Sequence, residues 1–96
     1  MNLNLNYEGF ENNLKERGPK HDGVHYVFKF ENGYGASVIK HYFSYGHERD
    51  LWELAVIRFY RDDEWDLEYD TDITDDVLGY LTDERVRELL QKIKDL

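Results

Sequence analysis

A run from Val24 to Phe30, in which apolar side chains recur at every second position, constrains the fold more than any other part of this sequence. Every second position is apolar and aromatic or branched, namely Val24, Tyr26, Phe28 and Phe30. A period of two is typical of a β-strand with one buried face. Asn32-Gly33 follows directly and favours a tight hairpin, because these residues tolerate positive φ. We therefore predict an antiparallel pair whose returning strand runs from Ala36 to Phe43.

Two further strands are predicted, from Leu51 to Tyr60 and from Asp66 to Asp70. The longer one has apolar residues on both faces, with Trp52, Leu54 and Val56 on one and Leu51, Ala55, Ile57 and Phe59 on the other. Such a strand is central and covered on both sides, or one side is closed by a partner subunit. In the shorter strand, Leu67 and Tyr69 are expected to face inward and the acids outward.

Helical spacing appears at both ends of the chain. Tyr7, Phe10 and Leu14 recur at i, i+3 and i+7, which predicts a short helix from about Tyr7 to Arg17. Near the other end, Thr74 and Thr82 are candidate N-caps for two helices, over residues 75–81 and 83–96. The buried stripe of the last helix is expected to consist of Val86, Leu89, Leu90 and Ile93.

These elements predict one domain over residues 1–96 with an α+β fold. It consists of a four-stranded antiparallel β-meander with a short N-terminal helix and C-terminal helices packed on the sheet. A chain of 96 residues with 41% hydrophobic residues has room for one core and not for two.

Several classes of protein are disfavoured by composition. The chain has no cysteine, so disulfides, thiolate metal sites and a cysteine nucleophile are absent. No window approaches the roughly 20 apolar residues of a membrane span, and the first residues lack the features of a signal peptide. We therefore expect a protein of the cytoplasm that has no membrane partner.

The negative charge is concentrated in one region. The net charge is −9, from 12 basic and 21 acidic residues. Residues 1–61 contain 8 acids and 8 bases, whereas residues 62–96 contain 13 acids and 4 bases. Nucleic-acid binding requires cationic groups that displace counterions from phosphates, so direct binding is not expected. A partner protein with a basic surface fits this charge better.

A family resemblance rests on three segments of the sequence. They read Asn-Gly-Tyr-Gly-Ala-Ser-Val-Ile from Asn32, Leu-Trp-Glu-Leu-Ala-Val from Leu51, and Tyr-Asp-Thr from Tyr69 with Ile-Thr-Asp-Asp-Val-Leu-Gly-Tyr-Leu from Ile73. Together they resemble a family of small uncharacterised proteins encoded by bacteriophages. The chain departs from that pattern at Asp72, where a proline is expected, and in a longer, more charged segment from Arg58 to Glu64. The resemblance implies a phage origin and location in the cytoplasm of the host cell, and it assigns no catalytic residues to this chain.

The most concentrated feature is an acidic segment over residues 62–76, with nine acids in fifteen residues. Its candidate partner-binding residues are Asp62, Asp63, Glu64, Trp65, Asp66, Glu68, Asp70, Asp72, Asp75 and Asp76. In an extended strand Asp66, Glu68 and Asp70 would form a row with a spacing of about 6.6 to 6.8 Å. One hypothesis is that this row mimics a nucleic-acid backbone. The alternative is a solvated edge strand whose charges prevent aggregation.

Other constellations give weaker signals. The EF-hand register fails from Asp62, because Leu67 stands where glycine is required. His21 and His25 lie around a turn and not on an HExxH helix, so no metal site and no cofactor are expected. Ser37 and Ser44 lack a nucleophile-elbow context, and we find no catalytic set.

The leading hypothesis is therefore a non-enzymatic protein that binds and modulates a host protein through the acidic segment. The target would be a factor of host defence or one that binds nucleic acid. One alternative is a structural or assembly accessory that self-associates through the second apolar face of the sheet. A less favoured alternative is a metal-dependent enzyme that uses clustered carboxylates.

Overall fold

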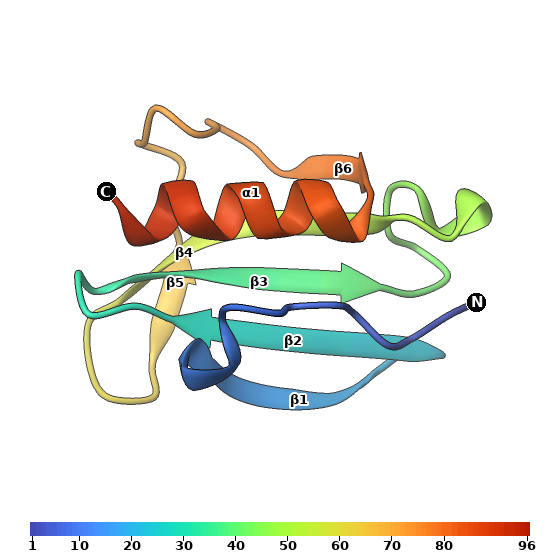
Figure 1. Ribbon diagram of the computed structural model, residues 1–96, viewed down its shortest axis with the longest axis horizontal. Coiled ribbons are helices and arrows are strands. Elements are labelled where there is room, and N and C mark those ends of the chain that lie inside the picture. The colour runs from blue at the N-terminus through green and yellow to red at the C-terminus, as the bar shows by residue number, and fades with distance from the viewer.

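The alternating run of aromatic residues forms the second strand of an antiparallel sheet. In the computed structural model, which describes residues 1–96, β2 (Gly23–Lys29) pairs with β1 (Leu14–Lys20) on one side and with β3 (Tyr34–Lys40) on the other. β4 (Trp52–Phe59) pairs antiparallel with β3. The sheet and a single C-terminal α-helix are arranged as shown in Figure 1, and the α+β prediction is confirmed.

The last position of the sheet is shared by two short strands. β5 (Trp65–Leu67) pairs with the end of β4, from Ile57 to Phe59, and β6 (Leu78–Leu81) pairs with its beginning, from Trp52 to Leu54. Both run antiparallel to β4, so they form one edge strand that a connection of residues 68–77 interrupts. The prediction of four strands is therefore wrong, because it missed β1 and β6 and extended the fourth strand to Asp70.

The C-terminal helix agrees with its prediction. α1 (Asp83–Lys94) begins after Thr82, whose Oγ1 accepts a hydrogen bond of 3.1 Å from the backbone N–H of Arg85. The expected stripe is buried against the sheet, and all four residues are at most 1% exposed: Val86, Leu89, Leu90 and Ile93. No helix of the protein has the length and apolar character needed to cross a membrane.

The hairpin between β2 and β3 also closes the end of α1. Gly33 adopts φ of +87°, as the Asn-Gly signal predicts. The side chain of Asn32 accepts from the N–H of Tyr34 and donates to the carbonyls of Ile93, Lys94 and Leu96, at 2.9 to 3.2 Å. Because the last carbonyls of a helix lack intrahelical donors, this amide side chain couples the turn to the helix.

The predicted N-terminal helix from Tyr7 to Arg17 is not formed. Residues 1–10 are extended or turn-like, η1 (Glu11–Asn13) is a single 3-10 turn, and Leu14 begins β1. Tyr7, Phe10 and Leu14 do contact the core, as their apolar character requires, but from a turn and a strand instead of one helical face. Pro19 is accommodated in β1 because this strand lies at the sheet edge.

The predicted helix over residues 75–81 is also wrong. Thr74 does not cap a helix but forms a local turn, in which its Oγ1 contacts the backbone N–H and the carbonyl of Asp76. The chain then extends into β6, and Tyr80 within it has φ of +58°. The C-terminal part therefore contributes one helix, not several.

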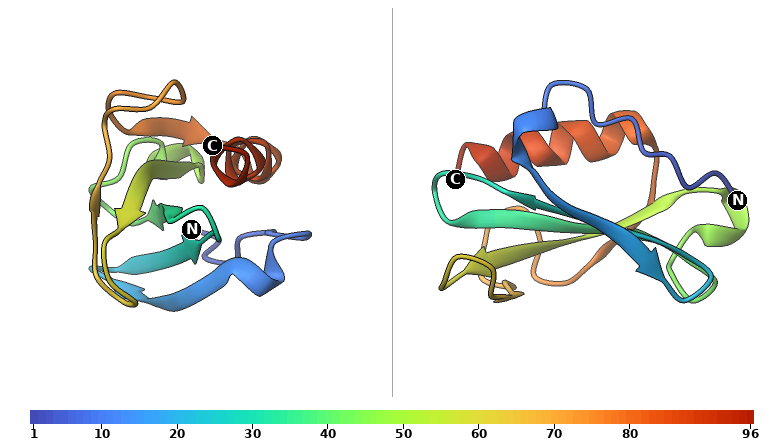
Figure 2. Two further views of the ribbon diagram at one scale, coloured as in Figure 1. Left: turned by 90° about the vertical axis from the view of Figure 1, so that its left-hand side faces the viewer. Right: turned by 90° about the horizontal axis from the view of Figure 1, so that it is seen from below.

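The face of the sheet opposite α1 is partly covered by the chain itself. Val27, Ile57 and Phe59 form a small second cluster on that face, and the half-buried Trp65 packs against it. Figure 2 shows the segment after β4 running along the side of the sheet away from the helix. The apolar residues predicted on both faces of the long strand are thus explained without a partner subunit.

Candidate interaction surfaces

The acidic segment begins at the turn after β4, where basic residues of the first two strands reach it. Lys15 forms an ion pair with Asp63, and this pairing holds the pKa of the Asp63 carboxyl below its usual range. Lys29 donates a hydrogen bond of 3.0 Å to the backbone carbonyl of Asp62. These two lysines, one on each of β1 and β2, fix the position of the turn.

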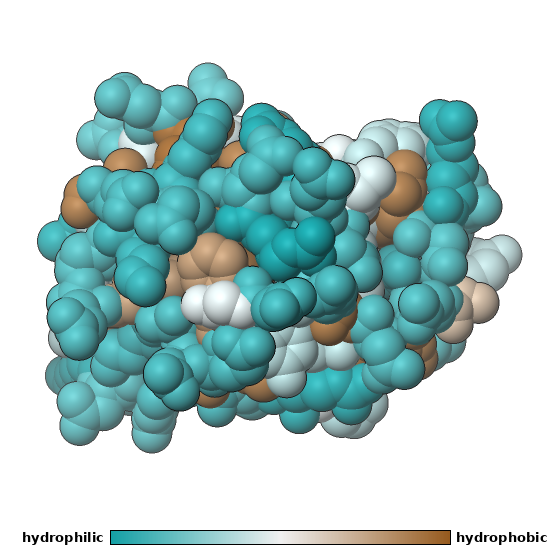
Figure 3. All heavy atoms as spheres, viewed as in Figure 1, coloured by the Kyte–Doolittle hydropathy of each residue, from teal (hydrophilic) through white to brown (hydrophobic).

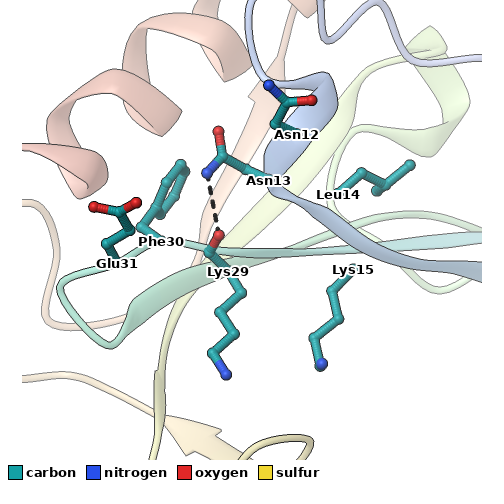
Figure 4. A pocket seen from close by; sticks show the side chains of 7 residues that line it. All are labelled: Asn12, Asn13, Leu14, Lys15, Lys29, Phe30 and Glu31. Carbon is teal, nitrogen blue, oxygen red and sulfur yellow. Dashed lines mark hydrogen bonds between the residues drawn. The ribbon is translucent and has the colours of Figure 1, made fainter.

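The same lysines border an open depression of about 420 Å³ beside the β1–β2 pair. Figure 4 shows both lysine side chains pointing to the same side, away from α1, while the Asn13 amide donates to the carbonyl of Lys29 at 3.2 Å. The depression has two hydrophobic lining residues and holds no cluster of acids or histidines. Its polar groups serve the fold, and we assign it no ligand.

The expected row of carboxylates is shorter than the sequence predicts. Asp66 lies opposite Arg58 on β4, and the N–H of Glu68 still bonds to Val56. β5 ends at Leu67, so Asp70 does not continue the row along a strand. The pKa of Tyr60 is raised by partial desolvation and by the nearby Glu64 and Asp66 carboxylates. The row is therefore limited to Asp66 and Glu68.

Beyond Glu68, several acids stabilise the connection between β5 and β6. The Glu68 carboxylate accepts from the N–H of Asp70 at 3.1 Å, and Asp76 accepts from the N–H of Val77 at 2.8 Å. Asp70, Asp72 and Asp75 are exposed, and no hydrogen bond or ion pair involves their carboxylates. Some acids of this connection thus stabilise turns by accepting backbone hydrogen bonds, and the carboxylates of the others form no polar contact within the protein.

The apolar residues within this segment divide between the core and the surface. Trp65 packs inward, 6.2 Å between ring centroids from His25. Leu67 and Tyr69, which were expected to face inward, are 47% and 45% exposed. That prediction is wrong, because β5 is a short strand at the edge of the sheet that ends at Leu67. Tyr60 is also exposed, so apolar side chains are interspersed among the acids.

A second surface, which sequence reasoning missed, lies at the opposite end of the long axis. We define the aromatic end as the exposed side chains of Tyr42, Phe43, Tyr45 and Tyr80, together with His21, His41 and His47. In Figure 1 the connection from β3 to β4, which carries five of these residues, lies to the right, and the turn after β4 lies to the left. Phe43 is 72% exposed, more than any other large hydrophobic residue.

The loop that presents these aromatic rings is held by its own hydrogen bonds. The buried Ser44 hydroxyl accepts from the N–H of His41 and donates to its carbonyl, at 3.0 and 2.9 Å. Nδ1 of His41 accepts from the N–H of Phe43 at 3.0 Å. The rings of His21, His41 and Phe43 pack edge to face with centroids 4.8 to 6.3 Å apart. The exposed rings are therefore presented on an ordered scaffold.

Backbone strain is concentrated at this end. Three non-glycine residues have positive φ, namely His21, Asp50 and Tyr80, and all three belong to turns or strands that meet here. Residues in this conformation are rare outside glycine and cluster at functional sites. Burial lowers the pKa of His41, and the neighbouring His21 and Lys20 lower it further. Hydrogen bonding to Glu48 raises the pKa of Tyr80.

One sequence signal could have found the aromatic end. Tyr42, Phe43 and Tyr45 stand close together in the sequence, at and just beyond the end of the predicted strand from Ala36 to Phe43. Across the face in Figure 3, polar residues dominate and apolar residues emerge in small separate patches. No group of three or more acids or histidines lies close enough to share a metal ion.

Comparison with protein-family models, with curated proteins and with solved structures finds no match to this chain.

Proposed function

We propose that this chain is a non-enzymatic protein that binds a partner protein with a basic surface, through the acidic segment of residues 62–76. The observation that carries the proposal is that most of the acids are not neutralised by the fold. Ion pairs involve two of the nine carboxylates, Asp63 and Glu64, which leaves seven unpaired. Like charges at this density repel one another, and a cationic surface would relieve that repulsion.

The residues between the acids also favour an interface. Leu67 and Tyr69 are exposed beside the unpaired carboxylates, and Tyr60 is exposed directly after β4. Tyrosine is enriched in protein interfaces because one side chain offers apolar area and a hydrogen-bonding hydroxyl. In this proposal the rings anchor the partner, and the acids set its charge and orientation. The resemblance to phage proteins makes a bacterial factor of host defence or nucleic-acid binding the proposed partner.

The first prediction concerns charge reversal. We expect the quadruple variant Asp66→Lys, Asp70→Lys, Asp72→Lys and Asp75→Lys to lose about 100-fold or more of its affinity for the partner at low salt. Partners are captured from a bacterial lysate at low and high salt and identified by mass spectrometry. Affinity is then measured by fluorescence anisotropy with the purified protein that the wild type captured.

A matched control distinguishes the loss of the acidic segment from a change in the total charge of the protein. The variant Glu8→Lys, Glu16→Lys, Glu31→Lys and Glu84→Lys changes the net charge by the same amount, at four exposed acids that form no ion pair. We expect it to retain the partner. Retention of the partner by the acidic-segment variant, in a folded state, would contradict the proposal.

A second candidate function is self-association, and the aromatic end favours it. The face of the sheet that the sequence suggested for this role is partly covered by Trp65. The aromatic end is exposed and ordered. It lies far from the turn after β4, where the acidic segment begins, in a molecule 32 Å long. If two copies meet at their aromatic ends, their acidic segments stay farther apart than the Debye length of about 8 Å, so repulsion between them is screened.

The second prediction tests this candidate. We expect the wild type to sediment as a concentration-dependent mixture of monomer and dimer, and Tyr42→Ser with Phe43→Ser to sediment as a monomer throughout. Tyr60→Ser and Leu67→Ser, at exposed positions near the other end, serve as controls and should leave the equilibrium unchanged. A wild type that stays monomeric up to millimolar concentration would exclude the aromatic end as a self-association surface.

A further inference from the structure

The N-terminal strap, which we define as residues 2–7, lies on the same face of the sheet as α1. Figures 1 and 2 show it running along the direction of β2, between the helix and β1. It is extended, yet no backbone–backbone hydrogen bond involves residues 2–6. Its side chains alternate, with Leu3, Leu5 and Tyr7 against the core and the asparagines outward. The segment is thus bound to the sheet without being part of it.

Side chains of the surrounding elements bind the backbone of the strap instead. The central group is the Tyr26 hydroxyl, which accepts from the N–H of Leu5 at 3.1 Å and donates to the carbonyl of Leu3 at 2.8 Å. Arg17 donates to the same hydroxyl at 2.9 Å and so fixes its orientation. One tyrosine therefore satisfies an N–H and a carbonyl of the extended chain.

Both ends of the strap are bound in the same manner. At one end Asp50 accepts from the N–H of Asn2 at 2.7 Å, and the buried Lys40 donates to its carbonyl at 2.8 Å. At the other, Asp83 accepts from the N–H of Asn6 at 3.2 Å, and Arg87 donates to its carbonyl at 3.0 Å. Six backbone groups are thus bound by charged or phenolic side chains.

This pattern differs from ordinary tertiary packing, because the polar contacts recognise main-chain atoms and the apolar contacts require a hydrophobic residue at every second position. Such contacts suit any extended segment with that alternation. We propose that the groove between α1 and the β1–β2 pair is a binding groove for an extended peptide of a partner protein, with apolar side chains at alternate positions. The strap occupies this groove as a displaceable internal ligand, tethered by the turn at Glu8 and Gly9.

The proposal is tested in the full chain with a labelled peptide of residues 1–10 as the probe. The variant Leu5→Glu places a charge at a residue that is 6% exposed, and it should release the strap and free the groove. The matched variant Asn4→Glu adds the same charge at an exposed position, and its strap should stay bound. We expect the peptide to bind Leu5→Glu at least about 100-fold more tightly than it binds Asn4→Glu. In Asn4→Glu the tethered strap competes with the peptide for the groove, at an effective concentration on the order of millimolar.

Recognition of the backbone has its own readout. Adding Tyr26→Phe to Leu5→Glu removes the hydroxyl that contacts Leu3 and Leu5, and it should weaken peptide binding at least tenfold. A peptide with aspartate in place of both leucines should not bind. A folded Leu5→Glu variant that binds no peptide at millimolar concentration would overturn the proposal.

Hydrogen exchange in the wild type provides a test that does not depend on the folding of a variant. If the strap is displaceable, the amides of Asn2, Leu5 and Asn6 should exchange together, at least about 100-fold faster than the paired amides of β2 and β3. Exchange of these amides at the rate of global unfolding would show that the strap is an integral part of the core, and would overturn the proposal.

Discussion

Replacing Gly35 with alanine is expected to lower the free energy of unfolding by about 3 kcal/mol or more, because the added carbon has no space. A Cβ at this position would lie 2.0 Å from the carbonyl oxygen of Phe28 and 2.9 Å from the ring of Phe59. The first contact is with backbone in the neighbouring strand, so relief requires β2 and β3 to separate. Urea unfolding monitored by tryptophan fluorescence measures the change.

Gly18→Ala is the matched control. Gly18 lies in β1 of the same sheet, and a Cβ there would meet no atom within 4 Å. Alanine at this position should be neutral or stabilising by a few tenths of a kcal/mol, since it restricts the unfolded chain. Equal losses in the two variants would mean that alanine is unfavourable for a general reason and that the close approach of β2 and β3 is not the cause.

The second large effect is expected at Asp83, where alanine should cost about 3 kcal/mol. The Asp83 carboxylate accepts a hydrogen bond of 2.6 Å from Nε1 of Trp52, a residue that is 1% exposed, and another from the strap at Asn6. Removing the acceptor leaves a buried indole N–H unpaired, which costs about 1 to 3 kcal/mol. The variant also loses a negative charge in the first turn of α1, worth about 0.3 to 1 kcal/mol.

Two variants separate these contributions, with thermal and urea unfolding as the measurements. Asp83→Asn retains an oxygen acceptor without the charge, so it should recover more than half of the lost stability. Glu84→Ala removes a charge from the same helical turn at an exposed residue and should cost less than about 1 kcal/mol. A loss at Glu84 as large as that at Asp83 would assign the effect to the helix dipole alone.

The elements predicted correctly are those whose sequence pattern coincides with one buried face. The strand at Val24 to Phe30 and the helix from Asp83 each alternate or repeat with the period of their structure, because one side packs on the core. β1 gave no such signal. Its sequence Leu-Lys-Glu-Arg-Gly-Pro-Lys is largely exposed at the sheet edge, so burial imposes no alternation on it.

The two wrong helices rested on different local signals. Tyr7, Phe10 and Leu14 have helical spacing, but they contact the core from a turn and a strand, and spacing alone does not distinguish this case from a helical face. Thr74 was expected to be an N-cap, but the same hydroxyl also stabilises a turn, here with Asp76. The roles of Asn32 at the end of α1 and of Asp83 on Trp52 involve separations of 61 and 31 residues, which a local pattern does not contain.

The residues of the acidic segment could be predicted from the sequence, but their arrangement in space could not. The concentration of acids over residues 62–76 was evident from the sequence, and the structure leaves most of these acids unpaired. No local pattern indicates that Lys15 pairs with Asp63 or that β5 ends at Leu67, since both depend on how the edge of the sheet closes. The binding of the strap to the sheet could not be predicted either, because the side chains that contact its backbone come from four separate elements and a loop.

The shared edge position of β5 and β6 makes the fold tolerant of change in length. Each of these strands is held in register by its own pairing with β4, so the ten residues between them are not needed to align either one. Residues could be added to or removed from this connection, or a small domain inserted, while the sheet and α1 keep their geometry. The acidic segment thus ends in a connection whose length the pairing of the sheet does not constrain.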